Sequence, residues 1–261
     1  FGVSGHHRGG GVFAPWLTRA RQWKALFAKE TRWKFLFIGT FGTALPFSIL
    51  LWALHYTTPG NAAILQQSEL LYSLLIAAVF LREIPTKQQL LGSTLILAGV
   101  ILILLKAPYT PRWTGDLMVV GCTWLLQAAS CVAKKLPKHL DHRLIAAARN
   151  VYALPALAVI LAVLACQGGL TLKPNLQAAW VLLYTGIFKY GWAMILWYQA
   201  IRALDLGKVT AIYLSYPVLS FLLSLILGLE PLHLYQLVGL GLTLAGAYWV
   251  SLIVKKQQEY A

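Results

Sequence analysis

The chain alternates between long apolar stretches and short polar connections. Each stretch has roughly the 20 residues that a helix needs to cross about 30 Å of hydrocarbon. We predict eight membrane-spanning helices, at residues 35–56, 62–81, 87–105, 115–133, 144–166, 178–200, 209–228 and 233–254. Helices are favoured because backbone groups in lipid must be satisfied locally, and the alternating strands of a barrel are absent from the pattern. The expected fold class is therefore an all-α polytopic membrane protein.

One segment occurs twice. Residues Gly60 to Gly99 align without a gap with Gly207 to Gly246, at a constant offset of 147 positions. The matched residues include Ser68 with Ser215, Glu83 with Glu230, Gln89 with Gln236, Gly92 with Gly239 and Gly99 with Gly246. Shared apolar composition does not by itself produce matched glutamate, glutamine and glycine residues. We therefore interpret the two copies as an internal duplication.

Composition agrees with a membrane protein. Of 261 residues, 59% are hydrophobic and 11% are charged, about half the charged fraction of an ordinary soluble domain. The three cysteines, Cys122, Cys131 and Cys166, all lie in apolar segments. This position argues against a disulfide framework or a zinc site. We expect no bound metal and no cofactor.

The net charge of +14 could indicate nucleic acid binding, but the positions of the cations along the chain argue against it. If the N-terminus is cytoplasmic, 17 of the 22 Lys and Arg residues lie on the cytoplasmic side and three on the other. This asymmetry follows the positive-inside rule and explains the basic charge without nucleic acid. Residues 1–34 and 255–261 are then basic cytoplasmic tails. We expect a multi-pass protein of the bacterial inner membrane, with an organelle membrane as the alternative.

Repeat and topology together predict an inverted arrangement. The first copy belongs to spans one to three, residues 35–105, and the second to spans six to eight. An odd shift of five spans turns the second copy upside down, which places a binding site between the halves near the bilayer midplane. Two further spans precede the second copy, so residues 115–254 form a five-helix unit. The first unit is then an incomplete version that lacks two opening helices.

These features resemble the drug/metabolite transporter superfamily and, within it, the EamA-like transporters. The resemblance covers roughly Ile38 to Val254. It rests on the loops from Thr58 to Ala63 and from Asp205 to Ala211, on Glu83-Ile84-Pro85 and Glu230-Pro231, and on Gln-x-x-Gly at Gln89 and Gln236. It implies a ten-helix carrier with inverted repeats that works by alternating access. This chain departs from that pattern in having eight spans, and in Leu70 where the second copy has Pro217.

The resemblance implies a secondary transporter that moves a small polar metabolite across the lipid bilayer. The alternative is an incomplete membrane scaffold or subunit that does not transport. An enzyme is not expected, since the spans contain no nucleophile–base motif and no metal-ligand motif. A homodimer is left open.

Polar residues inside the spans are the candidates for solute binding, because they are costly in lipid. Span two has a face formed by Gln66, Glu69 and Ser73, at helical spacing,. The offset of 147 pairs this face with Tyr213, Tyr216 and Ser220 in span seven. Two equivalent polar faces are what a central cavity between the repeats requires.

Two charges lie deep in the predicted spans. Lys189 is almost at the middle of span six, and Glu69 is close to the middle of span two. The two residues form either a structural ion pair or parts of a solute site. In the second case Lys189 attracts a carboxylate or phosphate, and Glu69 binds an amine or carries a coupling proton.

Three further residues have open assignments. Trp192 lies one turn from Lys189, where it either lines the cavity or forms a cation–π contact. Gln127 in span four either faces the cavity or bonds a neighbouring helix. Arg149, near the start of span five, either reaches the cytoplasmic face or anchors Asn150.

Overall fold

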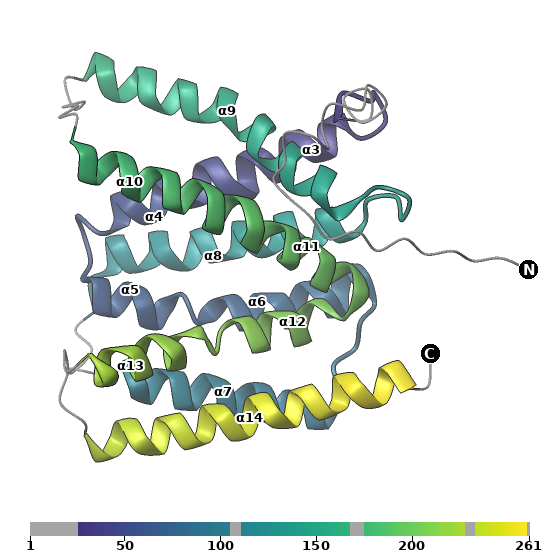
Figure 1. The fold of residues 1–261 in the computed structure, drawn as a ribbon, viewed down its shortest axis with the longest axis vertical. Helices are drawn as coiled ribbons and strands as arrows, with labels where there is room; N and C mark the ends of the chain where they lie inside the picture. Colours follow the sequence, from purple (N-terminus) through teal and green to yellow (C-terminus); the bar gives the residue numbers. More distant parts are fainter. Residues whose placement is uncertain (1–25, 105–110, 168–174, 228–232, 260–261) are drawn as a thin grey trace, which may run out of the picture.

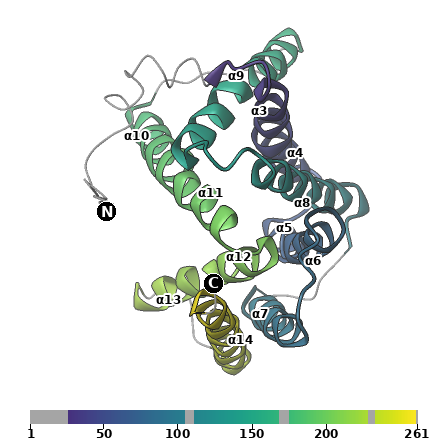
Figure 2. The same ribbon diagram turned by 90° about the vertical axis from the view of Figure 1, so that its right-hand side faces the viewer.

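The computed structural model describes residues 26–104, 111–167, 175–227 and 233–259. All regular elements in these ranges are helices. They run roughly parallel to one another, with α9 (His142–Cys166) at one edge of the bundle and α7 (Lys87–Leu104) with α14 (Leu234–Glu259) at the opposite edge (Figure 1). The end-on view in Figure 2 shows α7 and α14 side by side.

Six helical stretches of the described residues are long and apolar enough to cross a membrane. They are Arg32–Ala53, Pro59–Leu81, Lys87–Leu104, Trp113–Lys134, His142–Cys166 and Leu176–Ala203. The expectation of an all-helical polytopic membrane protein is thus confirmed. The seventh predicted position holds α12 (Leu206–Tyr213) and α13 (Tyr216–Ile226), and the eighth holds α14. That these two also cross the membrane stays a prediction.

Three of the six stretches consist of successive helical segments. The first contains α3 (Arg32–Gly39), the π-helical stretch η1 (Thr40–Ala44) and α4 (Leu45–Ala53). The second contains α5 (Pro59–Leu65), α6 (Ser68–Ile76) and the π-helical η2 (Ala77–Leu81). The sixth contains α10 (Leu176–Tyr184), the π-helical η3 (Thr185–Trp192) and α11 (Ala193–Ala203). The other three stretches are single helices, namely α7, α8 (Trp113–Lys134) and α9.

The interruptions fall at positions that the sequence alignment pairs. The break between α5 and α6 corresponds, at the offset of 147, to the break between α12 and α13, within one residue. The stretch η1 likewise corresponds to residues 187–191, which lie inside η3. At the first break the backbone bonds shorten to i→i−3, as in Gln67 N–H to the Ile64 carbonyl (3.0 Å),. The Gln67 side chain donates to the Ala63 carbonyl (3.3 Å), so a side chain replaces part of the missing ladder.

The two largest apolar cores among the described residues join most of the helices. The larger core joins α3, α6, η2, α8, α9, α11 and α12, and its buried members include Phe35, Ile145 and Ile201. The smaller core joins α6, α7, α12 and α14 around Leu70 and Ile96. Helices α6 and α12 each contribute to both cores and therefore connect the two parts of the bundle.

Helices α7 and α14 pack closely through glycines. Gly92 lies against the backbone of Gly246, and Gly99 lies against the backbone of Gly239, so the two helices run antiparallel. A Cβ added at Gly99 would meet the Thr243 hydroxyl at 2.3 Å and the Gly239 carbonyl oxygen at 2.5 Å. Small residues allow this approach, and in lipid close packing is a main source of helix association.

We predict that Gly99→Ala destabilises the protein, because the added methyl group collides with backbone that cannot rotate away. Overpacking of this kind costs about 1–3 kcal/mol. The matched control is Gly121→Ala in α8, where an added Cβ meets nothing within 4 Å. Thermal unfolding of the purified protein in detergent should show a lowered midpoint for the first variant only. Equal midpoints for the two variants would contradict the proposed packing.

Candidate functional site

A buried carboxyl group lies between α6 and α8. Gln127 donates from Nε2 to Oε1 of Glu69 at 2.7 Å, and the two side chains are 0% and 9% exposed respectively. The hydroxyls of Ser68, which directly precedes Glu69, and of Thr123, one turn before Gln127, are 2.9 Å apart. Among the described residues, no Lys, Arg or His lies within ion-pair distance of Glu69. The carboxyl group therefore has a neutral amide as its side-chain partner.

Aromatic residues of the second copy approach this carboxyl group. The hydroxyls of Tyr213 and Tyr216 lie within electrostatic range of Glu69. Their rings are 5.7 Å apart, and Tyr213 also packs edge-on against Trp197 at 5.3 Å. The break between α12 and α13 lies between the two tyrosines, so the ring pair marks an interruption of the helix.

A second polar cluster surrounds α9. Arg149, only 4% exposed, donates from Nη2 to the Gly42 carbonyl in η1 at 2.8 Å. The next residue, Asn150, donates to the Tyr190 carbonyl in η3 at 2.9 Å. Nη1 of Arg149 is buried and has no hydrogen-bond partner among the residues that the structure describes. Arg149 also lies within electrostatic range of Tyr213, as Glu69 does.

Lys189 lies in η3 and is exposed on the surface of the described chain. Its Nζ is 4.9 Å from the ring centre of Phe47 and 5.6 Å from that of Tyr190. The expected cation–π environment is therefore supplied by these two rings, while Trp192 is 55% exposed. Glu69 and Lys189 do not form an ion pair with each other in the structure. The alternative that they are a structural ion pair is therefore wrong.

The continuous polar faces expected from helical spacing are wrong in one respect. Gln66 stands in the break before α6, so it does not share a regular helix with Glu69 and Ser73. Ser73 is fully buried and donates to the Leu70 carbonyl of its own helix at 2.8 Å. Tyr213 is the last residue of α12 and Tyr216 is the first residue of α13, so these two residues do not share a regular helix either. The side chain of Ser220 lies outside the described part of the structure.

Several polar contacts were not among the sequence-based candidates. Thr57 donates to Asp116 at 2.6 Å and joins the start of α8 to the chain before α5. The contact between Ser68 and Thr123 was not predicted either, because single hydroxyl residues are common in helices and do not by themselves indicate a site. A surface depression of about 320 Å³ is lined by Arg32, Trp33, Leu36 and Tyr152. None of the predicted solute-binding residues lines it.

Comparison with known proteins gives a consistent result. The family model described as "EamA-like transporter family" matches residues 9–105 and 113–252. An "Uncharacterized transporter" of Archaeoglobus fulgidus is 25% identical over 89% of this chain and 82% of its own length. The "Uncharacterized transporter YyaM" of Bacillus subtilis is 23% identical over 84% of this chain and 72% of its own. A solved crystal structure at 20% identity has a TM-score of 0.76 over 93% of this chain and 82% of that one, which indicates a shared fold.

We predict that Gln127→Leu lowers the free energy of unfolding by about 1–3 kcal/mol, because Glu69 loses its buried partner. Adding Glu69→Leu to this variant should recover part of the loss, since both polar groups are then gone. A double-mutant cycle by thermal unfolding in detergent measures the coupling. Strictly additive effects of the two substitutions would show that the bond contributes nothing.

Proposed function

This chain belongs to the EamA-like transporter family, and we propose that it is a secondary transporter that moves a small polar or charged metabolite by alternating access. The coarser part follows from membership: the chain is a multi-pass membrane transporter. The proposal adds the mechanism, in which two halves rock around a solute site near the bilayer midplane.

The pairing of structural features supports an inverted repeat. The break between α5 and α6 and the π-helical stretch η1 each have a counterpart at the offset of 147, at the break between α12 and α13 and inside η3. The contacts of Gly92 with Gly246 and of Gly99 with Gly239 exchange under the same offset, which is the relation that a two-fold axis in the membrane plane produces. We accordingly propose residues 35–105 and 115–254 as the two repeat units, within eight spans.

The observation that carries the proposal is the environment of Glu69. A carboxyl group in a membrane span costs about 2.5–3.5 kcal/mol on insertion scales and normally marks a functional site. Here its side-chain partner is the neutral Gln127, and the tyrosines beside it come from the other copy. Glu69 therefore remains available to bind an amine or a coupling proton at the boundary between the copies.

The proposed solute site is centred on Glu69, Gln127, Tyr213 and Tyr216, next to the two helix breaks. Broken helices expose backbone groups that can bind a solute, which is common in transporters. Arg149 and Lys189 supply positive charge for a carboxylate or phosphate of the solute. Further proposed lining residues are Gln66, Ser73, Trp192 and Ser220.

Orientation and location are part of the proposal. The distribution of cations places both termini in the cytoplasm. Transporters with similar sequences come from bacteria and archaea, which supports a bacterial inner membrane. A homodimer stays a prediction.

We predict that Glu69→Gln reduces solute flux at least tenfold, because the amide can neither carry a proton nor pair with a cation. Flux is measured by counterflow in proteoliposomes with labelled carboxylic acids, amines, sugars and nucleosides. Lys189→Ala should weaken transport of the anionic solutes selectively. Lys135→Gln serves as the control, since Lys135 is an exposed cation at the end of α8 that lies outside the proposed site. Wild-type flux in Glu69→Gln would remove this residue from the mechanism.

A further inference from the structure

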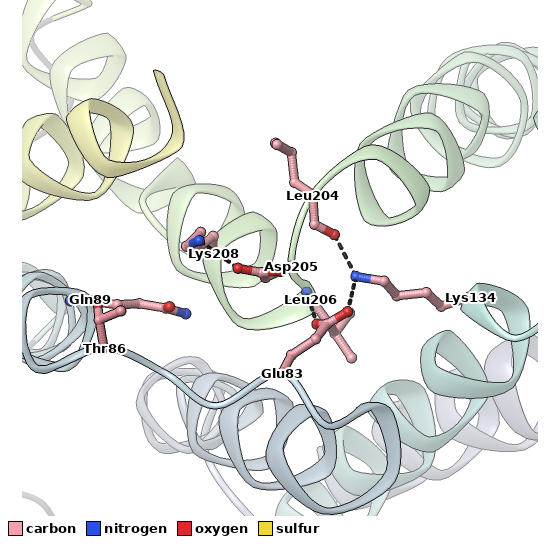
Figure 3. Close-up of polar contacts among 8 residues, drawn as sticks. All are labelled: Glu83, Thr86, Gln89, Lys134, Leu204, Asp205, Leu206 and Lys208. Atoms are coloured by element: carbon pink, nitrogen blue, oxygen red, sulfur yellow. Dashed lines mark hydrogen bonds and ion pairs between the residues drawn. The ribbon is translucent and has the colours of Figure 1, made fainter. Parts of the chain in front are cut away.

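A charged cluster joins three elements at the end of the bundle where α3 begins and α14 ends (Figures 1 and 3). One carboxylate oxygen of Glu83 pairs with Nζ of Lys134, at the last residue of α8. The other oxygen accepts the backbone N–H of Leu206, the first residue of α12, at 2.9 Å. Lys134 also donates to the Leu204 carbonyl. We call these four residues the polar latch.

The backbone before Glu83 is shaped for this contact. Arg82 has φ 58°, and within the described residues it is the one non-glycine residue with a positive φ. Side chains adopt this left-handed conformation at a cost, so it persists only where the surroundings impose it. The Glu83 N–H bonds the Ala77 carbonyl at 3.0 Å and closes the turn. The chain thus leaves η2 abruptly and presents Glu83 to α12.

The N-terminus of α12 is capped by the carboxylate of Glu83, which comes from another part of the chain. Its N-cap residue, Asp205, forms no side-chain cap bond and instead pairs with Lys208. The corresponding helix of the first copy, α5, is capped locally by Thr58, whose hydroxyl accepts the Asn61 N–H at 3.1 Å. Pro59 stands there in the place of Leu206 and has no N–H to offer,. A bond from this N–H to a carboxylate can therefore form at the start of α12 but not at the start of α5.

The start of α12 is also packed tightly against α6 and α7. A Cβ at Gly207 would lie 2.6 Å from Leu74 and 3.0 Å from the Gln89 amide nitrogen. Lys208 is only 1% exposed. The latch thus holds together the ends of α8, η2 and α12 where they are already in close contact. Helix α8 carries Gln127, helix α12 carries Tyr213, and η2 continues α6, which carries Glu69.

We propose that the polar latch closes the solute path at the cytoplasmic end and must open in each transport cycle. This inference rests on the proposed function and deepens it. A carboxylate at a helix N-terminus and an ion pair are both strong in low dielectric and weak in water. Hydration of this end during opening would therefore weaken the latch, and the return of dry packing would restore it.

Two native cysteines of α8 report on the opening. Cys131 is 6% exposed and lies one turn before Lys134, whereas Cys122 is 1% exposed and lies deeper, within electrostatic range of Glu69. Two backgrounds each retain one of them, Cys122→Ala with Cys166→Ala and Cys131→Ala with Cys166→Ala. A membrane-impermeant maleimide is added to inside-out vesicles, and the rate of labelling is measured for each background.

We expect Lys134→Met and Glu83→Gln to raise the labelling rates of both cysteines at least tenfold. Lys134→Arg, which keeps the charge, should label like the wild type. Lys135→Met is the matched control, because Lys135 is the next residue, exposed and 5.7 Å from the Phe80 ring centre, and it should also label like the wild type. Should Lys134→Met fail to fold, Glu83→Gln carries the test, since it preserves an oxygen for the Leu206 N–H.

Unchanged rates in Glu83→Gln would overturn the proposal. A rise for Cys131 alone would also overturn it, since this would mean fraying at the end of α8 without opening toward Glu69. The labelling needs no solute and is thus independent of transport. If the cysteines are labelled as expected but the protein shows no solute flux in proteoliposomes, the proposed function is refuted. If the protein transports solute but the latch variants leave the labelling rates unchanged, the role of the latch is refuted.

Discussion

The hydrocarbon core of a membrane contains no water to satisfy polar groups, so each buried polar group must find its partner within the protein. This constraint organises the interior of the bundle. Glu69 pairs with Gln127, and Gln67 bonds a carbonyl beside the first helix break. Arg149 and Asn150 reach the carbonyls of two π-helical stretches. Irregular backbone is tolerated here because side chains of neighbouring segments complete its hydrogen bonds.

The apolar runs of the sequence predicted the positions of the helices to within a few residues. This works because length and hydropathy are properties of each segment by itself. The breaks after Leu65 and Tyr213 were not predicted in this way. The second break lies just before Pro217, yet the first occurs at the paired position although Leu70 stands where the second copy has this proline. Both breaks therefore depend on tertiary contacts, which a single sequence does not display.

The sequence singled out the residues of the candidate site, but it could not predict the contacts that they make. Glu69 and Gln127 stood out as polar residues in apolar spans, but their mutual bond depends on how α6 and α8 are rotated toward each other. Lys189 shows a second limit. It lies in η3, and a π-helical stretch has wider turns that shift the direction of every later side chain. Counting by the α-helical period therefore could not predict that the rings of Phe47 and Tyr190 surround its ammonium group.

The bonds made by α9 have a mechanical consequence. Its consecutive residues Arg149 and Asn150 grip one π-helical stretch from each copy, at Gly42 and Tyr190. If the two stretches move relative to each other, at least one of these two hydrogen bonds must break. In the hydrocarbon core, water does not replace such a bond. Under the proposed alternating access, helix α9 would therefore be expected to move as one unit with the first and the sixth stretch, because its two bonds join it to both.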